Sequence, residues 1–413
     1  MAEMARAQWN DFRRRLAEVE EACFLGTPLG EAEATALLGS AVAALGVAAP
    51  QPRVADRVRD AAALAAGRMS RVDYRDRHGA CGLRRFRSIG GTVIYLVPVE
   101  TLPGLVNNLY LLRTGERVAL FDAGSGTHTC AEELDRAARV LQAVFEERDL
   151  LSRVEDVIIS HAHIDHFGGL RTWKERGARV HVHALDRRVI ERFEERIIVA
   201  AADVRIYLER AGVSDHKRLE LAQMYVASKN FYRSVEVDHA LEDGVRIGPL
   251  VAHHTPGHCP GHVCLQVDNV LLTGDHVLSN ITPHQSPESI TPWTGLGHYL
   301  ESLEKVRRLP AIDLALGGHE EPVTLVAQRI ADIERFHRER LDKVKAICRE
   351  QKTVAEITAE LFGEQTGYGQ LLALEEAGAH VEYLAQRSLL EIANVEDFAK
   401  SPNPPVKYRA IDR

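Results

Sequence analysis

The spacing of apolar residues changes several times along the chain, and it is helical at the start. Phe12, Leu16, Val19 and Cys23 recur every three or four positions, which is the period of one face of a helix. This pattern predicts a helical N-terminal extension over residues 1–82. Since an apolar helix face normally packs against something, we expect the extension to pack on the rest of the chain or to form a homodimer.

The middle of the chain shows short apolar runs of strand type. They are rich in β-branched and aromatic residues, as strands are. The predicted strands are 92–97, 108–112, 117–121, 154–160, 245–247, 251–254, 263–267 and 270–272. A helix is expected between the third and fourth of them, from Cys130 to about Glu147. Strands that alternate with helices predict an α/β domain, which we place at residues 83–328.

Two further stretches return to helical spacing. Residues 186–233 carry many charged and aromatic side chains and no strand signal, which predicts a helical insertion inside the α/β domain. The second stretch, residues 329–413, predicts a small helical C-terminal domain. Insertions of this kind can close over a site, so we expect the first stretch to form a lid or simply to pack on the core.

One strand end carries an unusual density of metal-ligand side chains. The predicted strand 154–160 runs directly into His161, His163, Asp165 and His166. Imidazole nitrogens and carboxylate oxygens are ligands of zinc, iron and manganese. In an extended segment His161 and His163 project to the same side, and Asp165 and His166 need a turn that aims them at a second position. Four ligands in six residues therefore predict a metal site.

Four other loops repeat this design, with a ligand-type residue in a glycine-containing turn just after a strand signal. They contribute Asp122, His258, Asp275 and His319, each beside one or more glycines. Because such loops follow strand ends, we expect all five segments to meet at one edge of a sheet and to build one site.

In this order and spacing the five segments resemble the motifs of the metallo-β-lactamase superfamily, over about residues 90–322. The resemblance implies an αββα sandwich with the site at one edge. It also implies that His161, His163 and His258 hold one divalent metal ion. The second ion would be held by Asp165, His166 and His319.

The same resemblance assigns two more carboxylates. Asp275 would bridge both ions, and Asp122 would orient the first motif from behind the ligands. We expect two Zn²⁺ ions, with iron or manganese as alternatives, because His/Asp sites accept all three.

The expected activity is hydrolysis. Two ions about 3.5–4 Å apart share a water and lower its pKa, so that a bridging hydroxide attacks a polarised carbonyl or phosphoryl group. Asp165 and Asp275 are the expected catalytic carboxylates. We favour a small-molecule thioester, ester or lactone as substrate, as in glyoxalase II-like enzymes.

Several alternatives lie within and outside the superfamily. The best-known zinc β-lactamases carry Cys where this chain has Asp275, which argues against antibiotic hydrolysis. Diiron flavoprotein members carry Glu where this chain has His163, which argues against redox use. A mononuclear iron persulfide dioxygenase-like enzyme remains an alternative, and so does a metal-dependent endoribonuclease or phosphodiesterase. The latter is suggested by the C-terminal region, which resembles the winged-helix-like tail of one branch. The complete ligand set argues against a non-catalytic binding protein.

Other polar residues near the motifs receive structural interpretations. We expect His262 to support or pack beside the ligands, His276 to be structural, and Cys259 to take no metal. His284 is a candidate substrate contact, because its loop resembles one that borders the site in a hydrolase subgroup.

The composition of the chain limits which partners and which compartment we expect. The net charge of −8 makes nucleic acid a less expected partner than a small molecule. The six cysteines show no CxxC pair, so we expect reduced thiols. The start of the chain has no apolar signal segment and no apolar run is long enough to cross a membrane, which predicts a cytoplasmic protein without a membrane partner.

Overall fold

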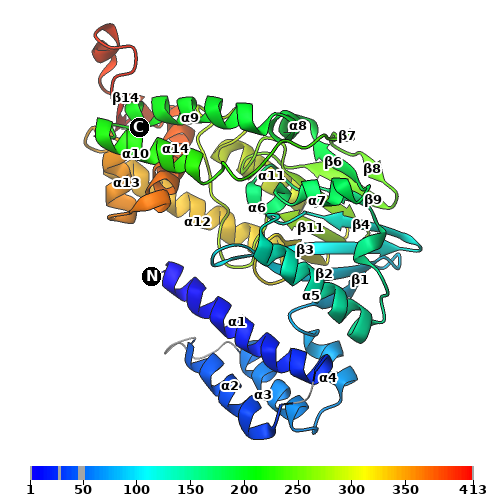
Figure 1. Cartoon of the computed structure of the whole chain (residues 1–413). Coiled ribbons are helices and arrows are strands. Elements are labelled where there is room, and N and C mark those ends of the chain that lie inside the picture. The colour runs from blue at the N-terminus through cyan, green and yellow to red at the C-terminus, as the bar shows by residue number, and fades with distance from the viewer. Residues whose placement is uncertain (1, 27–28, 45–51, 412–413) are drawn as a thin grey trace. The chain divides into compact units, whose positions relative to one another are not determined.

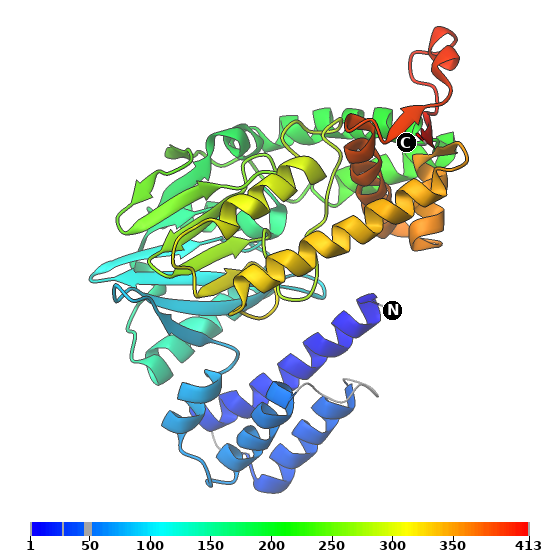
Figure 2. The same cartoon turned by 180° about the vertical axis from the view of Figure 1, so that it is seen from behind.

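The computed structural model describes residues 2–26, 29–44 and 52–411. Figures 1 and 2 show the helices and strands of the chain. The chain divides into two compact units. The first comprises Met1–Ile158 and Gly169–Arg179, and the second comprises Ile159–Gly168 and Val180–Arg413. None of the helices within the described ranges combines the length and apolar character needed to cross a bilayer.

The first unit begins with four helices, which confirms the helical N-terminal extension where the chain is described. They are α1 (Ala2–Phe24), α2 (Glu31–Ala44), α3 (Pro52–Ala65) and α4 (Arg71–His78); residues 27–28 and 45–51 of the predicted stretch lie outside the described part. Glu20 is fully buried and accepts hydrogen bonds from Arg57 at 2.7 Å and from the Tyr74 hydroxyl at 2.5 Å. A paired and hydrogen-bonded carboxylate of this kind fixes how α1, α3 and α4 pack.

The first unit also holds five strands in the sheet order β1–β2–β3–β4–β5. They are β1 (Arg84–Arg87), β2 (Val93–Leu102), β3 (Leu105–Thr114), β4 (Arg117–Phe121) and β5 (Val154–Ile158). Neighbours from β1 to β4 are antiparallel, while β4 and β5 are parallel. Parallel neighbours need a crossover, which α5 (His128–Phe145) supplies in agreement with the predicted helix. Helix α7 (Leu170–Glu175) belongs to this unit as well.

The second unit contains a five-stranded sheet in the order β12–β11–β10–β9–β8. Its strands are β8 (Arg246–Ile247), β9 (Leu250–His254), β10 (Val263–Val267), β11 (Val270–Gly274) and β12 (Leu314–Gly317). Strands β11 and β12 run parallel and the other neighbours are antiparallel. Strands β6 (Arg179–His183) and β7 (His239–Leu241) pair in parallel. Helices α11 (Leu296–Arg307) and α12 (Val326–Ile347) share an apolar core with β10 and β11.

The predicted insertion forms α8 (Ala184–Glu191), α9 (Phe193–Arg210) and α10 (Asp215–Ala227). The C-terminal region adds α13 (Val354–Phe362) and α14 (Gly367–Gln386). It also has three short strands that the helical prediction missed, paired in the order β13–β15–β14. These are β13 (Lys352–Thr353), β14 (Leu390–Ile392) and β15 (Lys407–Ala410). They are two to four residues long, too short to show an alternating pattern.

The insertion and the C-terminal region share one apolar core. Val204, Leu208 and Leu221 of the insertion pack in the same buried cluster as Val344 and Leu371. Hydrogen bonds add to the contact, since the Ala355 N–H donates to the Ala211 carbonyl at 2.8 Å and the Val406 N–H donates to the Arg210 carbonyl at 2.7 Å. Segments more than 100 residues apart in the sequence therefore form one helical subdomain.

Candidate metal centre

The segment with four ligand-type residues folds as its spacing predicts. His163 is extended, with φ −89° and ψ 144°, and it precedes the single turn of helix α6 (Ile164–Phe167). His161 and His163 thus point the same way, with Nε2 of His161 2.9 Å from Nδ1 of His163. The turn that redirects Asp165 and His166 is α6 itself.

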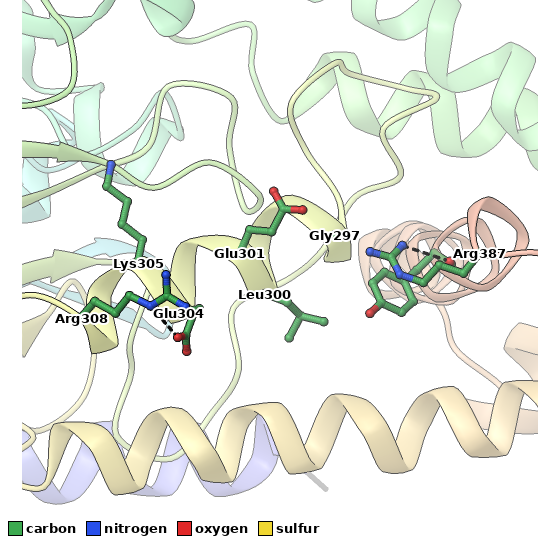
Figure 3. A pocket seen from close by; sticks show the side chains of 8 residues that line it. Gly297, Leu300, Glu301, Glu304, Lys305, Arg308 and Arg387 are labelled. Atoms are coloured by element: carbon green, nitrogen blue, oxygen red, sulfur yellow. Dashed lines mark hydrogen bonds and ion pairs between the residues drawn. The ribbon is translucent and has the colours of Figure 1, made fainter.

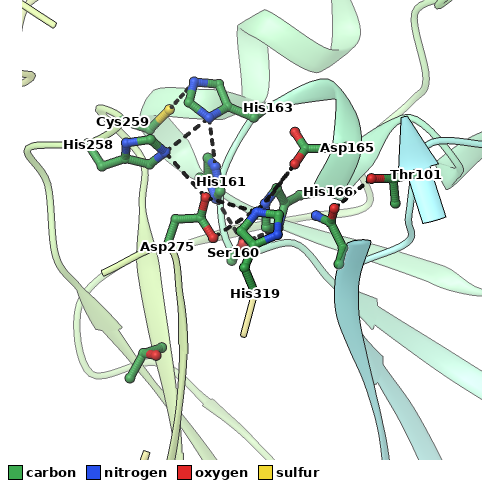
Figure 4. A network of polar contacts seen from close by, with 12 residues as sticks. Thr101, Ser160, His161, His163, Asp165, His166, His258, Cys259, Asp275 and His319 are labelled. Carbon is green, nitrogen blue, oxygen red and sulfur yellow. Dashed lines mark hydrogen bonds and ion pairs between the residues drawn. The ribbon is translucent and has the colours of Figure 1, made fainter. Parts of the chain in front are cut away.

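His258 joins the first two histidines to form one group. It lies in the loop between the antiparallel strands β9 and β10, and its Nε2 lies 3.0 Å from Nδ1 of His163. Its Nδ1 lies 2.7 Å from the backbone carbonyl of His284. Since a carbonyl only accepts, Nδ1 carries the proton and the Nε2 lone pair faces the other two rings. Figure 4 shows the three imidazoles converging.

Asp165, His166 and His319 form a second group directly beside the first. The carboxylate of Asp165 lies 3.4 Å from Nε2 of His166 and 3.6 Å from Nε2 of His319. The three side chains are buried. The structure therefore brings together the two ligand sets that the resemblance assigns.

Asp275 lies between the two groups. Its Oδ2 is 3.7 Å from Nε2 of His258 and 3.4 Å from Nε2 of His319, and its Oδ1 is 3.5 Å from Nε2 of His166. The topology explains this position, because Asp275 and His319 follow the ends of β11 and β12, which are parallel neighbours.

Most of these groups already have the ionisation of metal ligands. Burial and neighbouring imidazoles hold the pKa values of His161 and His163 well below their usual range, so both rings are neutral. Burial alone would raise the pKa values of Asp165 and Asp275, but the nearby histidines outweigh it and hold both pKa values well below the usual range. Burial lowers the pKa of His319, yet the two carboxylates raise it to about 10, so metal binding there would release a proton.

The donor set fits two divalent cations. Neutral imidazoles and ionised carboxylates are the forms that bind metal. Oδ1 of Asp275 is buried without a hydrogen-bond donor, and a buried carboxylate oxygen is costly to leave in that state. A cation between the two groups would satisfy it.

Comparison with known proteins agrees with this geometry. The family model described as the metallo-beta-lactamase superfamily matches residues 102–319. The chain belongs to the metallo-beta-lactamase superfamily. The predicted α/β fold class is confirmed by a metallo-beta-lactamase family protein from Thermus thermophilus, with a TM-score of 0.62 and 26% identity. That match covers 77% of this chain and 98% of the other.

Curated relatives also match at low sequence identity. The beta-lactamase-like protein 2 homolog of Caenorhabditis elegans is 23% identical over 308 residues, which is 72% of this chain and 84% of that protein. The atrochrysone carboxyl ACP thioesterase of Aspergillus fumigatus is 25% identical over 275 residues, covering 62% and 68%. An N-acyl homoserine lactonase of Bacillus sp is 27% identical over 227 residues, covering 49% and 74%. Membership makes the chain a metallo-hydrolase of this superfamily.

Asp186 supports the metallo-beta-lactamase site and was missed by sequence reasoning. This buried residue of α8 accepts the backbone N–H of Ala162 at 2.8 Å and that of Gly261 at 2.8 Å. It thereby ties the loop of His161 to the loop of His258. Burial raises the pKa of Asp186 to about 6, against the two N–H groups that lower it. A lone aspartate at the start of a helix gave no signal of this role.

Ser160 and His262 also support ligands. The Ser160 hydroxyl lies 2.9 Å from Nδ1 of His161 and 3.4 Å from Nδ1 of His166, which leaves both Nε2 atoms for the metal side. Nε2 of His262 accepts the backbone N–H of Asp275 at 3.2 Å, and Nδ1 lies 2.8 Å from the Thr255 hydroxyl. The expectation that His262 supports the ligands agrees with this contact.

The remaining candidates are placed as follows. Cys259 is buried, with its sulfur 3.4 Å from Nε2 of His163, and burial raises the pKa of its thiol well above the usual range. His276 is fully buried, as a structural residue would be. Asp122 lies in the first unit, buried at the end of β4 with φ 64°; its orienting role stays a prediction. The His284 side chain is 25% exposed, and its contact with substrate stays a prediction as well.

Two other features lie elsewhere in the second unit. A third group of ligand-type side chains consists of His337, Glu376 and His380, but the Glu376 carboxylate already accepts from Arg340 and from the Gln285 N–H. The Arg340 bond joins α12 to α14, and the Gln285 bond joins a loop to α14. A surface pocket of about 540 Å³ opens beside α11 (Figure 3). None of the ligands proposed above lines it.

Proposed function

We propose that this chain is a dinuclear metal-dependent hydrolase that cleaves a small-molecule thioester, with esters and lactones as related substrates. The position of Asp275 carries the proposal. Its carboxylate lies within 3.4–3.7 Å of His258 from one ligand group and of His319 and His166 from the other. A carboxylate in this position would help to hold both cations and would offset part of their charge.

The bound ions would supply Lewis acidity, polarising the scissile carbonyl and lowering the pKa of a shared water towards about 7. The protein supplies geometry and charge. Asp165 is ionised beside His166 and His319, so its second role is to accept a hydrogen bond from the attacking water and orient it. Ser160, His262 and Asp186 hold the ligands in place, which reduces the reorganisation needed on binding.

A small acyl substrate is supported by two observations. The net charge of −8 disfavours a polyanionic partner. Two relatives at low identity are named for cleavage of an acyl thioester and of an N-acyl lactone. Zinc is the proposed metal, with iron and manganese as alternatives, since imidazole nitrogen and carboxylate oxygen bind all three.

The test is a substrate panel with purified, metal-loaded protein. It contains a lactoylglutathione-type thioester, an acyl-CoA, a lactone, a bis-aryl phosphodiester and a single-stranded RNA. Thioester turnover that is abolished by Asp275→Ala supports the proposal. Turnover of the phosphodiester or RNA alone would replace it with a nuclease. The winged-helix-like order of helices and strands from α12 to β15 makes that the second candidate.

A further inference from the structure

A series of hydrogen bonds joins helix α14 to the proposed ligand His258. Nδ1 of His258 donates to the backbone carbonyl of His284 at 2.7 Å. The imidazole of His284 bonds in turn to Oε2 of Glu375 at 2.9 Å, and the next N–H, that of Gln285, donates to Oε2 of Glu376 at 2.8 Å. Two consecutive side chains of α14 thus hold two consecutive residues of the loop.

The two glutamates are themselves firmly placed. Both are 8% exposed, and Glu376 also pairs with Arg340 of α12. One residue before them, the Leu374 carbonyl accepts the Tyr207 hydroxyl of α9 at 2.6 Å. A Cβ atom at Gly378 would lie 2.0 Å from that hydroxyl, so α9 and α14 are in close contact. Anchors from two helices make α14 a rigid support for the loop.

The position of the His284 carbonyl matters for metal binding. It selects the tautomer of His258 that presents Nε2 to the other ligands, and it fixes the rotation of the ring. A loop that shifts away would leave the ring free to rotate or to change tautomer. Groups of this kind alter metal affinity without touching the metal.

We propose that Glu375 and Glu376 are positioning residues for the metal centre, which fix the 284–285 loop so that the His284 carbonyl orients His258. The inference rests on the proposed function, because it takes His258 as a ligand. The residues that position the metal ligands then include two on α14, a helix of the helical subdomain that contains none of the ligand motifs.

The experiment measures metal affinity in Glu375→Leu and His284→Ala, the second of which keeps the backbone carbonyl but loses the anchor. Glu382→Leu is the matched control, since Glu382 lies on α14 and accepts the Ser289 N–H of the following segment at 3.1 Å. Apo-protein is titrated with Zn²⁺ against a chromophoric chelator, and thermal unfolding checks that each variant is folded. We expect one of the two binding steps to weaken about tenfold in both variants and to stay unchanged in the control.

Two further measurements sharpen the outcome. The double variant Glu375→Leu/His284→Ala should bind no more weakly than either single variant, because both remove the same anchor. Glu375→Gln, which keeps size and an acceptor oxygen, should show a smaller loss and covers the case in which the leucine variant does not fold. Unchanged affinity in folded Glu375→Gln and His284→Ala would overturn the proposal, as would an equal loss in Glu382→Leu.

¹⁵N spectra of the histidine rings in metal-free protein measure the tautomer of His258 and so test the positioning role apart from the proposed function. The wild-type His258 ring should show the Nδ1–H tautomer, and Glu375→Gln should show a mixture. If the wild type bound no metal, the proposed function would fail while this tautomer shift still supported the positioning role. An unchanged tautomer would overturn the positioning role whatever the metal content.

Discussion

The carboxylate of Asp186 occupies the space that a side chain at Gly261 would need. Oδ1 of Asp186 accepts the Gly261 N–H at 2.8 Å, and a Cβ atom at Gly261 would lie 2.5 Å from Cγ of the carboxylate. The second oxygen accepts the Ala162 N–H. One buried side chain therefore sets the distance between two ligand loops. This contact needs both the carboxylate of Asp186 and the absence of a Cβ atom at Gly261.

Asp186→Asn should weaken metal binding at the His161 group. The amide keeps the shape, but one of the two backbone N–H groups then faces an NH₂ donor and loses its partner, at a cost of about 1–3 kcal/mol. We expect metal affinity and kcat/KM to fall about 10- to 100-fold. Asp215→Asn is the control, since the Asp215 side chain is 93% exposed and pairs with Arg218 at the surface. Wild-type affinity in Asp186→Asn would contradict this role.

Gly318→Ala should displace ligands directly. A Cβ atom at this position would lie 2.6 Å from Oδ1 of Asp275 and 2.8 Å from Cε1 of His166. The methyl group thus enters the space between two proposed ligands of different segments. We expect loss of at least one metal ion, counted by elemental analysis. Gly369→Ala should retain the full metal content, since a Cβ atom there meets nothing within 4 Å.

The His284 anchor predicts how stability depends on pH. Burial lowers the pKa of His284, but Glu375 and Glu376 outweigh it and raise the pKa to about 9. The pKa of a histidine in an unfolded chain is about 6.5. Because folding raises this pKa, the stabilisation is fully present below about pH 6.5 and is lost as pH rises through about 9.

The comparison is between metal-free wild type and His284→Asn in urea unfolding. The wild-type advantage in free energy of unfolding should fall as pH rises from about 6 to about 9.5. A difference that stays constant over that range, or that grows, would show that the ion pair does not form.

The shared core predicts that the insertion and the C-terminal region lose stability together. Leu208 of α9 is fully buried in the cluster that includes Leu371 of α14. Leu208→Ala should cost about 2–5 kcal/mol, because it leaves a cavity. Hydrogen exchange should quicken in α14 as well as in α9. Ile198→Ala is the control, since Ile198 is 72% exposed. Faster exchange confined to α9 would contradict a single subdomain.

Much of the site was predictable because its ligands lie in short motifs. His161, His163, Asp165 and His166 are local in sequence, and the extended segment and the turn that separate them follow from their spacing. Asp275 and His319 could be placed together because strands that end side by side deliver neighbouring loops. The fold class followed in the same way from alternating strand and helix patterns.

The supporting residues were not predictable for an equally physical reason. Asp186 and Glu375 are carboxylates on helices. Asp186 bonds to Gly261, which is 75 residues away in the sequence, and Glu375 bonds to His284, which is 91 residues away. Helical periodicity distinguishes a buried face from an exposed one, but it does not say which backbone N–H a buried carboxylate will meet. The three short strands of the C-terminal region were not predicted, because each forms only by pairing with segments that are distant in the sequence.

The most direct test of the account is the number of metal ions per chain in wild type and in Asp275→Ala. The protein is purified, reloaded with zinc, and freed of loosely bound ions before elemental analysis. Because Asp275 lies between both ligand groups, we predict two ions in the wild type, fewer in the variant, and hydrolytic activity lost with them. A wild type that holds no ion after zinc, manganese and iron have each been offered would contradict the central claim.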